Sequence, residues 1–264
     1  MRTIIFITHS TLSEDHANMC FKALSNSKDP ISFDKLIIYN SHQEEFPNEE
    51  VLSIYDLYNM EFIKEVEFFD YDPTTPKCLG GDMRVITDYC VSNFEDTDQV
   101  LLLKSDCMLS INFLNELKKL EGKSEFIFTA PLINGKRSST NEDMFEYIKL
   151  PYPVLSSEDT FFMEDECGSQ ENHFRDRPGE NPGNSHIKWI SCTVKRDWSC
   201  HYVTVNLLPL IGKVNQDWGG CSFIHLKDKW IGAYKSFVLH KYHCIISENR
   251  EVVRPGEWGE WLRS

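Results

Sequence analysis

The segment Leu79–Leu109, LGGDMRVITDYCVSNFEDTDQVLLLKSDCML, contains the pattern that decides the fold. Apolar residues recur at three- and four-residue spacing over 85–94, which predicts a helix with one apolar face. Gly80 and Gly81 come just before this predicted helix and permit tight backbone geometry. The run Val100–Leu103 is continuously apolar, as is typical of a strand that is covered on both faces.

The predicted strand ends at Lys104, Ser105 and Asp106. In open α/β sheets, ligands bind outside the carboxyl ends of the strands, so we expect a binding site around these three residues. The first two predicted strands of the chain also end in polar residues, namely Thr8, His9, Ser10 and Asn40. The sequence therefore predicts one polar edge at which several strand ends meet.

Strands and helices alternate through the first half of the chain, which is the signature of a parallel sheet. Strands are predicted over Ile4–Ile7, Leu36–Tyr39, Phe62–Phe69 and Glu125–Ala130. Helices are predicted over Ser13–Lys22, Glu49–Tyr58, Ile111–Leu120 and Asn141–Leu150. Late elements are a β-hairpin of His186–Ser191 with Cys200–Val205, and a strand over Ile231–Leu239. We expect an α/β fold with a mostly parallel sheet flanked by helices and a smaller late β-hairpin region.

The 264-residue chain has a formal net charge of −14, which argues against nucleic acid or an anionic membrane surface as a partner. None of its apolar runs approaches the roughly 20 residues that a membrane-spanning helix needs. Its nine cysteines include no Cys-x-x-Cys pair, and Cys20 and Cys90 fall on apolar helix faces. We therefore expect buried thiols in a reducing compartment, and a cytoplasmic protein without a membrane span.

The order of these elements resembles the nucleotide-sugar-dependent glycosyltransferases of the GT-A fold. In that family, a glycine-rich segment and an Arg-bearing helix precede a hydrophobic strand that ends in Asp-x-Asp. Gly81 and Arg84 match the start of the helix, and Asp106 matches the second Asp, which binds a metal ion. Lys104 stands where the family has its first Asp. The size of the chain is also similar to that of the small soluble glycosyltransferases encoded by large algal viruses.

The resemblance implies a set of roles for the residues at the polar edge. Asp106 and His240, which follows the late strand, would hold Mn²⁺ or Mg²⁺, and imidazole with carboxylate suits Mn²⁺ better. The donor would be a nucleotide sugar, with a UDP-sugar favoured, and the acceptor a glycan or glycoprotein. Residues expected to bind the donor are Thr8, His9, Ser10, Asn40, Arg84, Lys104, Ser105, Asp106 and Lys241.

Asp217 begins the segment Asp-Trp-Gly-Gly late in the chain. In GT-A enzymes, an acid at the start of a late helix faces the acceptor and, in inverting members, removes its hydroxyl proton. Backbone N–H groups at a helix start would keep the Asp217 carboxylate ionised, as a general base requires. An Asp that only caps a helix is the alternative interpretation, and the sequence leaves both open.

We expect a single domain over residues 1–264. Residues 1–130 would form a nucleotide-binding half and residues 131–264 an acceptor-side half. The segment 156–185 is rich in Glu, Asp, Asn, Gly and Pro, and we expect it to form a long loop that contributes to acceptor selection.

Two other functions remain open at this stage. A sugar-phosphate nucleotidyltransferase would share the parallel sheet, but the segment after the first strand has neither the glycine nor the basic residue of its usual phosphate loop. A non-catalytic carbohydrate-binding protein with a transferase-like fold is the second alternative, and Lys104 in place of an acid is its best support.

Overall fold

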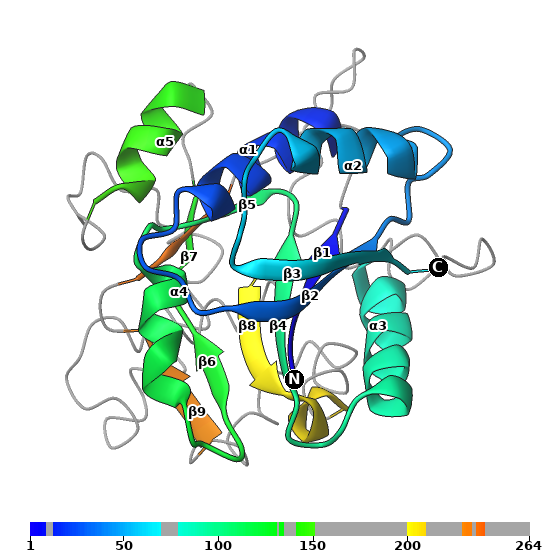
Figure 1. Cartoon of the computed structure of the whole chain (residues 1–264), viewed down its shortest axis with the longest axis vertical. Helices are drawn as coiled ribbons and strands as arrows, with labels where there is room; N and C mark the ends of the chain where they lie inside the picture. Colours follow the sequence, from blue (N-terminus) through cyan, green and yellow to red (C-terminus); the bar gives the residue numbers. More distant parts are fainter. Residues whose placement is uncertain are drawn as a thin grey trace, which may run out of the picture.

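A computed structural model describes residues 1–8, 13–69, 79–130, 132–134, 141–150, 200–209, 229–233 and 236–240 of the chain. These residues form a seven-stranded sheet and a three-stranded sheet (Figure 1). The strand order in the larger sheet is β3-β2-β1-β4-β8-β6-β9, and in the smaller sheet it is β5-β10-β7.

The strands of the larger sheet are β1 (Arg2–Ile7), β2 (Phe33–Tyr39), β3 (Ile63–Phe68), β4 (Gln99–Lys104), β6 (Ile127–Thr129), β8 (Cys200–Thr204) and β9 (Trp230–Gly232). Those of the smaller sheet are β5 (Cys107–Leu109), β7 (Leu132–Asn134) and β10 (Val238–His240). The α-helices are α1 (Ser13–Ser25), α2 (Asn48–Asp56), α3 (Leu79–Asn93), α4 (Phe113–Glu116) and α5 (Asn141–Ile148). Two 3₁₀ turns, η1 (Leu117–Leu120) and η2 (Val205–Leu207), complete the described elements.

Strand β1 is the central element of the parallel part of the larger sheet. It pairs in parallel with β2 on one side and with β4 on the other, and β2 pairs in parallel with β3. Residues 3–7 of β1 are all buried, as a strand covered on both faces requires. The predicted α/β class, with a mostly parallel sheet flanked by helices, is confirmed.

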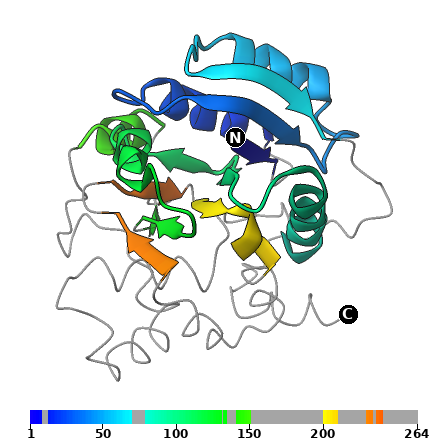
Figure 2. The same cartoon turned by 60° about the horizontal axis from the view of Figure 1, so that its bottom comes forward.

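Alternate residues of β1 point into two separate cores, because successive side chains of a strand face opposite ways. Ile4 and Phe6 pack against α1, α2, α4 and η1, whereas Ile5 and Ile7 pack against α3 and η2. Helices α1 and α2 lie side by side over the first face (Figures 1 and 2). A third core lies between α5, α1 and the smaller sheet. None of the described helices is long and apolar enough to cross a membrane.

Strand β8 lies between β4 and β6 and is antiparallel to both. It confirms the strand predicted over Cys200–Val205 and places it within the larger sheet. The other strand of the predicted hairpin, His186–Ser191, lies outside the described residues.

The prediction of a single strand over Ile231–Leu239 is wrong. The chain forms β9 next to β6 in one sheet and β10 next to β5 in the other. Two contacts hold the chain at the start of β10: the backbone N–H of Ser236 donates to the carboxylate of Glu116 (2.9 Å), and that of Phe237 donates to Ser110 Oγ (3.0 Å). These contacts bring the chain to β5, which explains the change of sheet.

Three smaller differences concern local structure. Helix α3 begins at Leu79, so Gly80 and Gly81 lie in its first turn and not before it. The helix predicted over Ile111–Leu120 is the short α4 followed by η1. Strands β5 and β7 were not predicted, because three residues are too few to show a period.

Candidate functional site

The ends of β1, β2 and β4 meet at the carboxyl edge of the larger sheet. The backbone N–H of Thr8 donates to the carbonyl of Tyr39 (3.1 Å), and that of Ser105 donates to the carbonyl of Ile7 (2.9 Å). Thr8, Asn40 and Ser105 therefore occupy neighbouring positions just beyond three parallel strands, and all three are buried. The structure brings these sequence-predicted residues together.

Thr8 and Asn40 form part of one hydrogen-bond network. Thr8 Oγ1 donates to Asn40 Oδ1 (2.8 Å), while Asn40 Nδ2 donates to the carbonyl of Phe46 (2.7 Å) and to Asn48 Oδ1 (3.0 Å). The backbone N–H of His42 also donates to Asn40 Oδ1 (3.0 Å). These bonds fix the loop after β2 against the end of β1, so Asn40 shapes this edge. Its role in binding a donor stays a prediction.

Lys104 and Asp106 form a buried ion pair at the end of β4. Lys104 Nζ lies 3.5 Å from Asp106 Oδ2, and the two side chains are 2% and 1% exposed. The thiol of Cys107 donates to the other carboxylate oxygen, Oδ1 (3.4 Å). The thiol of Cys20, on α1, donates to the backbone carbonyl of Lys104 (3.7 Å). Both oxygens of Asp106 thus have a neighbouring donor from the chain itself.

Thiols near this pair are a feature that sequence reasoning missed. Burial is the main cause that raises the pKa of Cys107 well above its usual value, and a hydrogen bond with Cys200 and the charge of Asp106 raise it further. Burial likewise raises the pKa of Cys20, with smaller effects from Cys200 and Asp106. The three cysteines are far apart in the sequence, so only their position in the fold brings them together.

We expect Cys20 and Cys107 to react slowly with iodoacetamide in the folded protein, because the thiolate is the nucleophile and their raised pKa values keep them protonated. Below the pKa of an ordinary thiol, its labelling rate rises about tenfold for each unit by which the pH increases, because the thiolate fraction rises by that factor. Mass spectrometry of peptides labelled at pH 7 and pH 9 should show little modification of either cysteine, and full modification in urea. Rapid labelling of Cys107 without denaturant would contradict the buried arrangement.

Strand β10 brings His240 next to the residue that follows Asp106. In the antiparallel pairing of β10 with β5, His240 lies opposite Cys107, and in the parallel pairing with β7 it lies beside Asn134. The buried carboxylate of Glu116 anchors the start of this strand by accepting from Ser236 Oγ (2.7 Å). The backbone of His240 is therefore close to the Lys104–Asp106 pair in the fold, while its side chain lies outside the described part, and its role in metal binding stays a prediction.

The remaining predicted site residues are not gathered here by the described structure. Arg84 is exposed on α3. Residues and segments that lie outside the described part of the chain are His9, Ser10, Asp217, Lys241 and the predicted loop 156–185.

The described residues do not fit a divalent metal ion at this edge. Among them, no three His, Cys, Asp or Glu side chains are grouped so that they could hold a metal. Asp106 is the one described carboxylate that the resemblance assigns to the metal, and a lysine ammonium lies 3.5 Å from its Oδ2. A dication at that oxygen would meet the repulsion of Lys104. The expectation of Mn²⁺ or Mg²⁺ therefore stays a prediction that depends on residues beyond the described ones.

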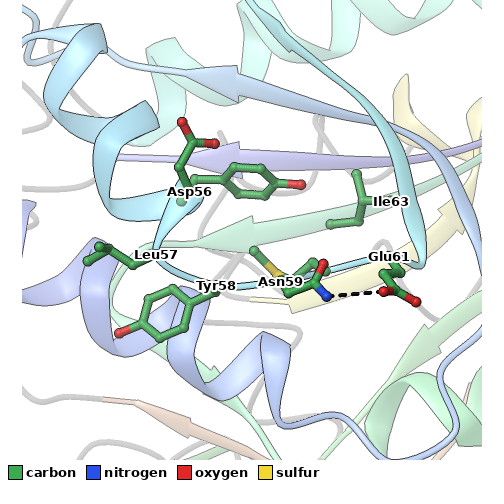
Figure 3. A pocket seen from close by; sticks show the side chains of 8 residues that line it. Asp56, Leu57, Tyr58, Asn59, Glu61 and Ile63 are labelled. Carbon is green, nitrogen blue, oxygen red and sulfur yellow. Dashed lines mark hydrogen bonds between the residues drawn. The ribbon is translucent and has the colours of Figure 1, made fainter.

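An open depression of about 460 Å³ lies at the opposite edge of the sheet, where α2 leads into β3 (Figure 3). It is lined by residues 55–61 and Ile63, and Leu57 there is 71% exposed. Three of the polar side chains in it form hydrogen bonds within the chain: Tyr58 donates to Asn18, and Asn59 Nδ2 donates to Glu61 Oε1 (3.1 Å). Because it lies at the start of β3, it does not belong to the site at the carboxyl edge.

No protein-family model and no curated protein matches the sequence. Among solved structures, the chain is similar to S. aureus TarS 1–349 in complex with UDP-GlcNAc, with a TM-score of 0.47 and 11% identity, over 92% of this chain and 59% of that chain. It is similar to the WbbM bifunctional glycosyltransferase, with a TM-score of 0.43 and 11% identity, over 88% of this chain and 38% of that chain. It is also similar to mouse xyloside xylosyltransferase 1, with a TM-score of 0.43 and 10% identity, over 87% of this chain and 76% of that chain. The chain spans about six tenths of the TarS 1–349 chain. With TM-scores below 0.5, these similarities establish no shared activity.

Proposed function

We propose that this chain is a glycosyltransferase that moves a sugar from a nucleotide diphosphate, with UDP favoured, to a hydroxyl group of a glycan or glycoprotein. One observation carries the proposal. The polar residues that follow three parallel strands converge at one edge of the sheet, next to a buried Lys104–Asp106 pair and the end of β10. Ligands of open α/β sheets bind at this edge.

The chemistry of sugar transfer needs two things from this edge. The leaving nucleoside diphosphate gains negative charge as its bond to the sugar breaks, so a fixed positive group near it lowers the barrier. Lys104 is such a group among the described residues. The attacking hydroxyl must also lose a proton, and we assign this role to Asp217 as the general base of an inverting reaction.

Donor hydrolysis and binding test the proposal directly. Purified protein would be incubated with UDP-glucose, UDP-N-acetylglucosamine, UDP-galactose, UDP-xylose and GDP-mannose, with and without simple saccharide acceptors, and released nucleoside diphosphate would be measured. In parallel, thermal unfolding would be followed with UDP, GDP and ADP. A ligand present at 100 times its Kd should add about 2.7 kcal/mol to the free energy of unfolding.

The proposal expects turnover of at least one donor and stabilisation by the matching diphosphate. Stabilisation without any turnover, in the presence of the full acceptor set, would instead favour a non-catalytic transferase-like protein. If no nucleotide stabilises the protein and no product forms, the proposal is contradicted.

A further inference from the structure

Strand β10 and the residue before it have no hydrophobic pattern that could select their register. Phe237, Val238 and Leu239 are all apolar, and none is more than 2% exposed. Val238 packs into one core, whereas Phe237 and Leu239 pack into another on the opposite face. Because both faces are buried, a slip by one residue would move none of these three side chains into water. The partner strand β5 reads Cys-Met-Leu and is likewise buried on both faces.

A buried carboxylate fixes the chain just before β10. Glu116 lies on α4 and is 5% exposed. Its Oε2 accepts two hydrogen bonds from Ser236, one from the backbone N–H (2.9 Å) and one from Oγ (2.7 Å). Its Oε1 lies 3.1 Å from the ammonium of Lys119. Ser236 is itself 1% exposed, so α4 holds this residue by contacts that are closed to water.

Ser110 provides a second polar contact at the same end of the strand. It follows β5 directly, and the pairing of Val238 with Leu109 places it opposite Phe237 in the ladder. Its backbone N–H donates to the carbonyl of Phe237 (3.0 Å), and its Oγ accepts from the N–H of Phe237 (3.0 Å). Together with the carboxylate on α4, these bonds distinguish the observed register from one that is shifted by a residue.

The register decides which residue lies at the edge of the larger sheet where strand ends converge. In the observed register, His240 is opposite Cys107, and Cys107 directly follows Asp106. A slip by one residue would put a neighbour of His240 in that place and turn every side chain of β10 to the other face. A buried carboxylate is costly, and fixing a register is the best-attested reason for keeping such a group.

We propose that Glu116 is a positioning residue: its carboxylate sets the register of β10 and thereby places residue 240 at the edge where the donor of the proposed function binds. The effect on sugar transfer rests on that proposed function, whereas the register can be measured without any ligand. No ligand needs to reach Glu116, because it acts through Ser236 alone.

Disulfide trapping reads the register directly. Met108→Cys would be combined in turn with Val238→Cys, Leu239→Cys and His240→Cys. Opposed residues of an antiparallel pair have Cα atoms about 4.5–5.5 Å apart, which suits a disulfide. After mild oxidation with diamide, mass spectrometry of the crosslinked peptides should show the Met108→Cys and Leu239→Cys pair, because these two residues are opposed in the native register. The other two pairs report a strand that has slipped by one residue in either direction.

Glu116→Leu keeps apolar volume but removes the acceptor of Ser236. We expect the ratio of slipped to native crosslink to rise by about 10- to 150-fold, the range for a lost hydrogen bond to a charged group. Glu116→Gln keeps an oxygen that can accept from Ser236, so it should retain the native crosslink. Glu121→Leu is the matched control, because Glu121 follows η1, is 59% exposed and pairs with Arg2 (3.1 Å). It should leave the ratio unchanged.

Donor turnover separates positioning from a purely structural role. With the donor found in the screen above, Glu116→Leu is expected to lower kcat/KM by about 100-fold, the order of magnitude for a displacement of about 1 Å at a reacting site. Glu116→Gln should restore turnover to near the wild-type value even where the two variants have the same thermal stability. Turnover that follows thermal stability, and not the crosslink ratio, would show that Glu116 only supports the fold.

Failure of this inference can be distinguished from failure of the proposed function. If Glu116→Leu is folded by circular dichroism and keeps the native crosslink, Glu116 does not set the register, and the proposed function is unaffected. If Glu116→Leu does not fold, Ser236→Ala takes its place, because it removes only the Oγ bond, and an unchanged crosslink ratio there overturns the inference equally. If the wild type turns over no donor, the proposed function fails and the role in sugar transfer fails with it, while the crosslinks still decide the register.

Discussion

Replacing Asp106 with alanine is expected to lower the free energy of unfolding by about 3–5 kcal/mol, which is the usual cost of breaking a buried ion pair by removing one partner. The ammonium of Lys104 would remain in a site that is closed to water, without the carboxylate that now faces it at 3.5 Å. Urea denaturation followed by circular dichroism measures the change, as a lower midpoint at an unchanged m-value.

Glu146→Ala is the matched control for this measurement. Glu146 pairs with Lys149 on the surface of α5, where the two side chains are 72% and 52% exposed. Exposed pairs three residues apart in a helix contribute only about 0.3–0.5 kcal/mol. If Asp106→Ala costs no more than this control, the Lys104–Asp106 pair is not buried as described.

A double variant separates the ion pair from the space it fills. Lys104→Met combined with Asp106→Leu removes both charges and keeps apolar volume, so we expect it to regain most of the stability that Asp106→Ala loses. Replacement of a buried pair by apolar side chains is often neutral or stabilising. A double variant as unstable as Asp106→Ala would show that lost packing, and not the broken ion pair, causes the effect.

Asp217→Asn is expected to lower kcat by roughly 10²–10⁴-fold, the range attributed to general acid–base catalysis. The amide keeps the shape of the carboxylate but cannot accept the acceptor's proton, so the affinity for the donor should stay nearly constant. Steady-state kinetics and calorimetry with the donor identified above would measure the two quantities. Asp56→Asn, which changes an exposed acid at the opposite edge of the sheet, should leave both unchanged.

The stereochemistry of the product decides the mechanism independently of that variant. An inverting transfer changes the anomeric configuration, which NMR reads from the product. A retained configuration would eliminate the inverting mechanism. Full activity of Asp217→Asn would show that Asp217 is not the general base and favour the helix-cap interpretation. The base would then be sought among Asp159, Glu164 and Asp165.

The parallel part of the fold could be predicted because its signals are local. Strand β4 contains a continuous apolar run, and Cys20 and Cys90, which the sequence places on apolar helix faces, are buried. Strand β5 could not be predicted in the same way, and β10 was predicted only as the end of a longer strand. Each has three residues, and each is stabilised by a partner that is about 130 residues away, as the pairing of Met108 with Leu239 illustrates.

The candidate site was predictable only as a set of strand ends. Parallel strands place their carboxyl ends at one edge, so Thr8, Asn40 and Ser105 could be expected to meet there. Their hydrogen bonds could not be predicted, because the amide of Asn40 donates to residues of a loop that has no sequence period. The contact between the Cys107 thiol and Asp106 likewise depends on the turn between β4 and β5.

The position of β8 has a consequence for synthesis of the chain on the ribosome. Until residues 200–204 emerge, β4 has only β1 as a neighbour in the larger sheet, and β6 has none, because its other partner is β9. The nascent chain must therefore carry an unpaired apolar strand edge while residues 105–199, which separate β4 from β8, are made. Such edges favour pairing with other chains. A protein built this way completes its central sheet only after more than three quarters of its length has been made.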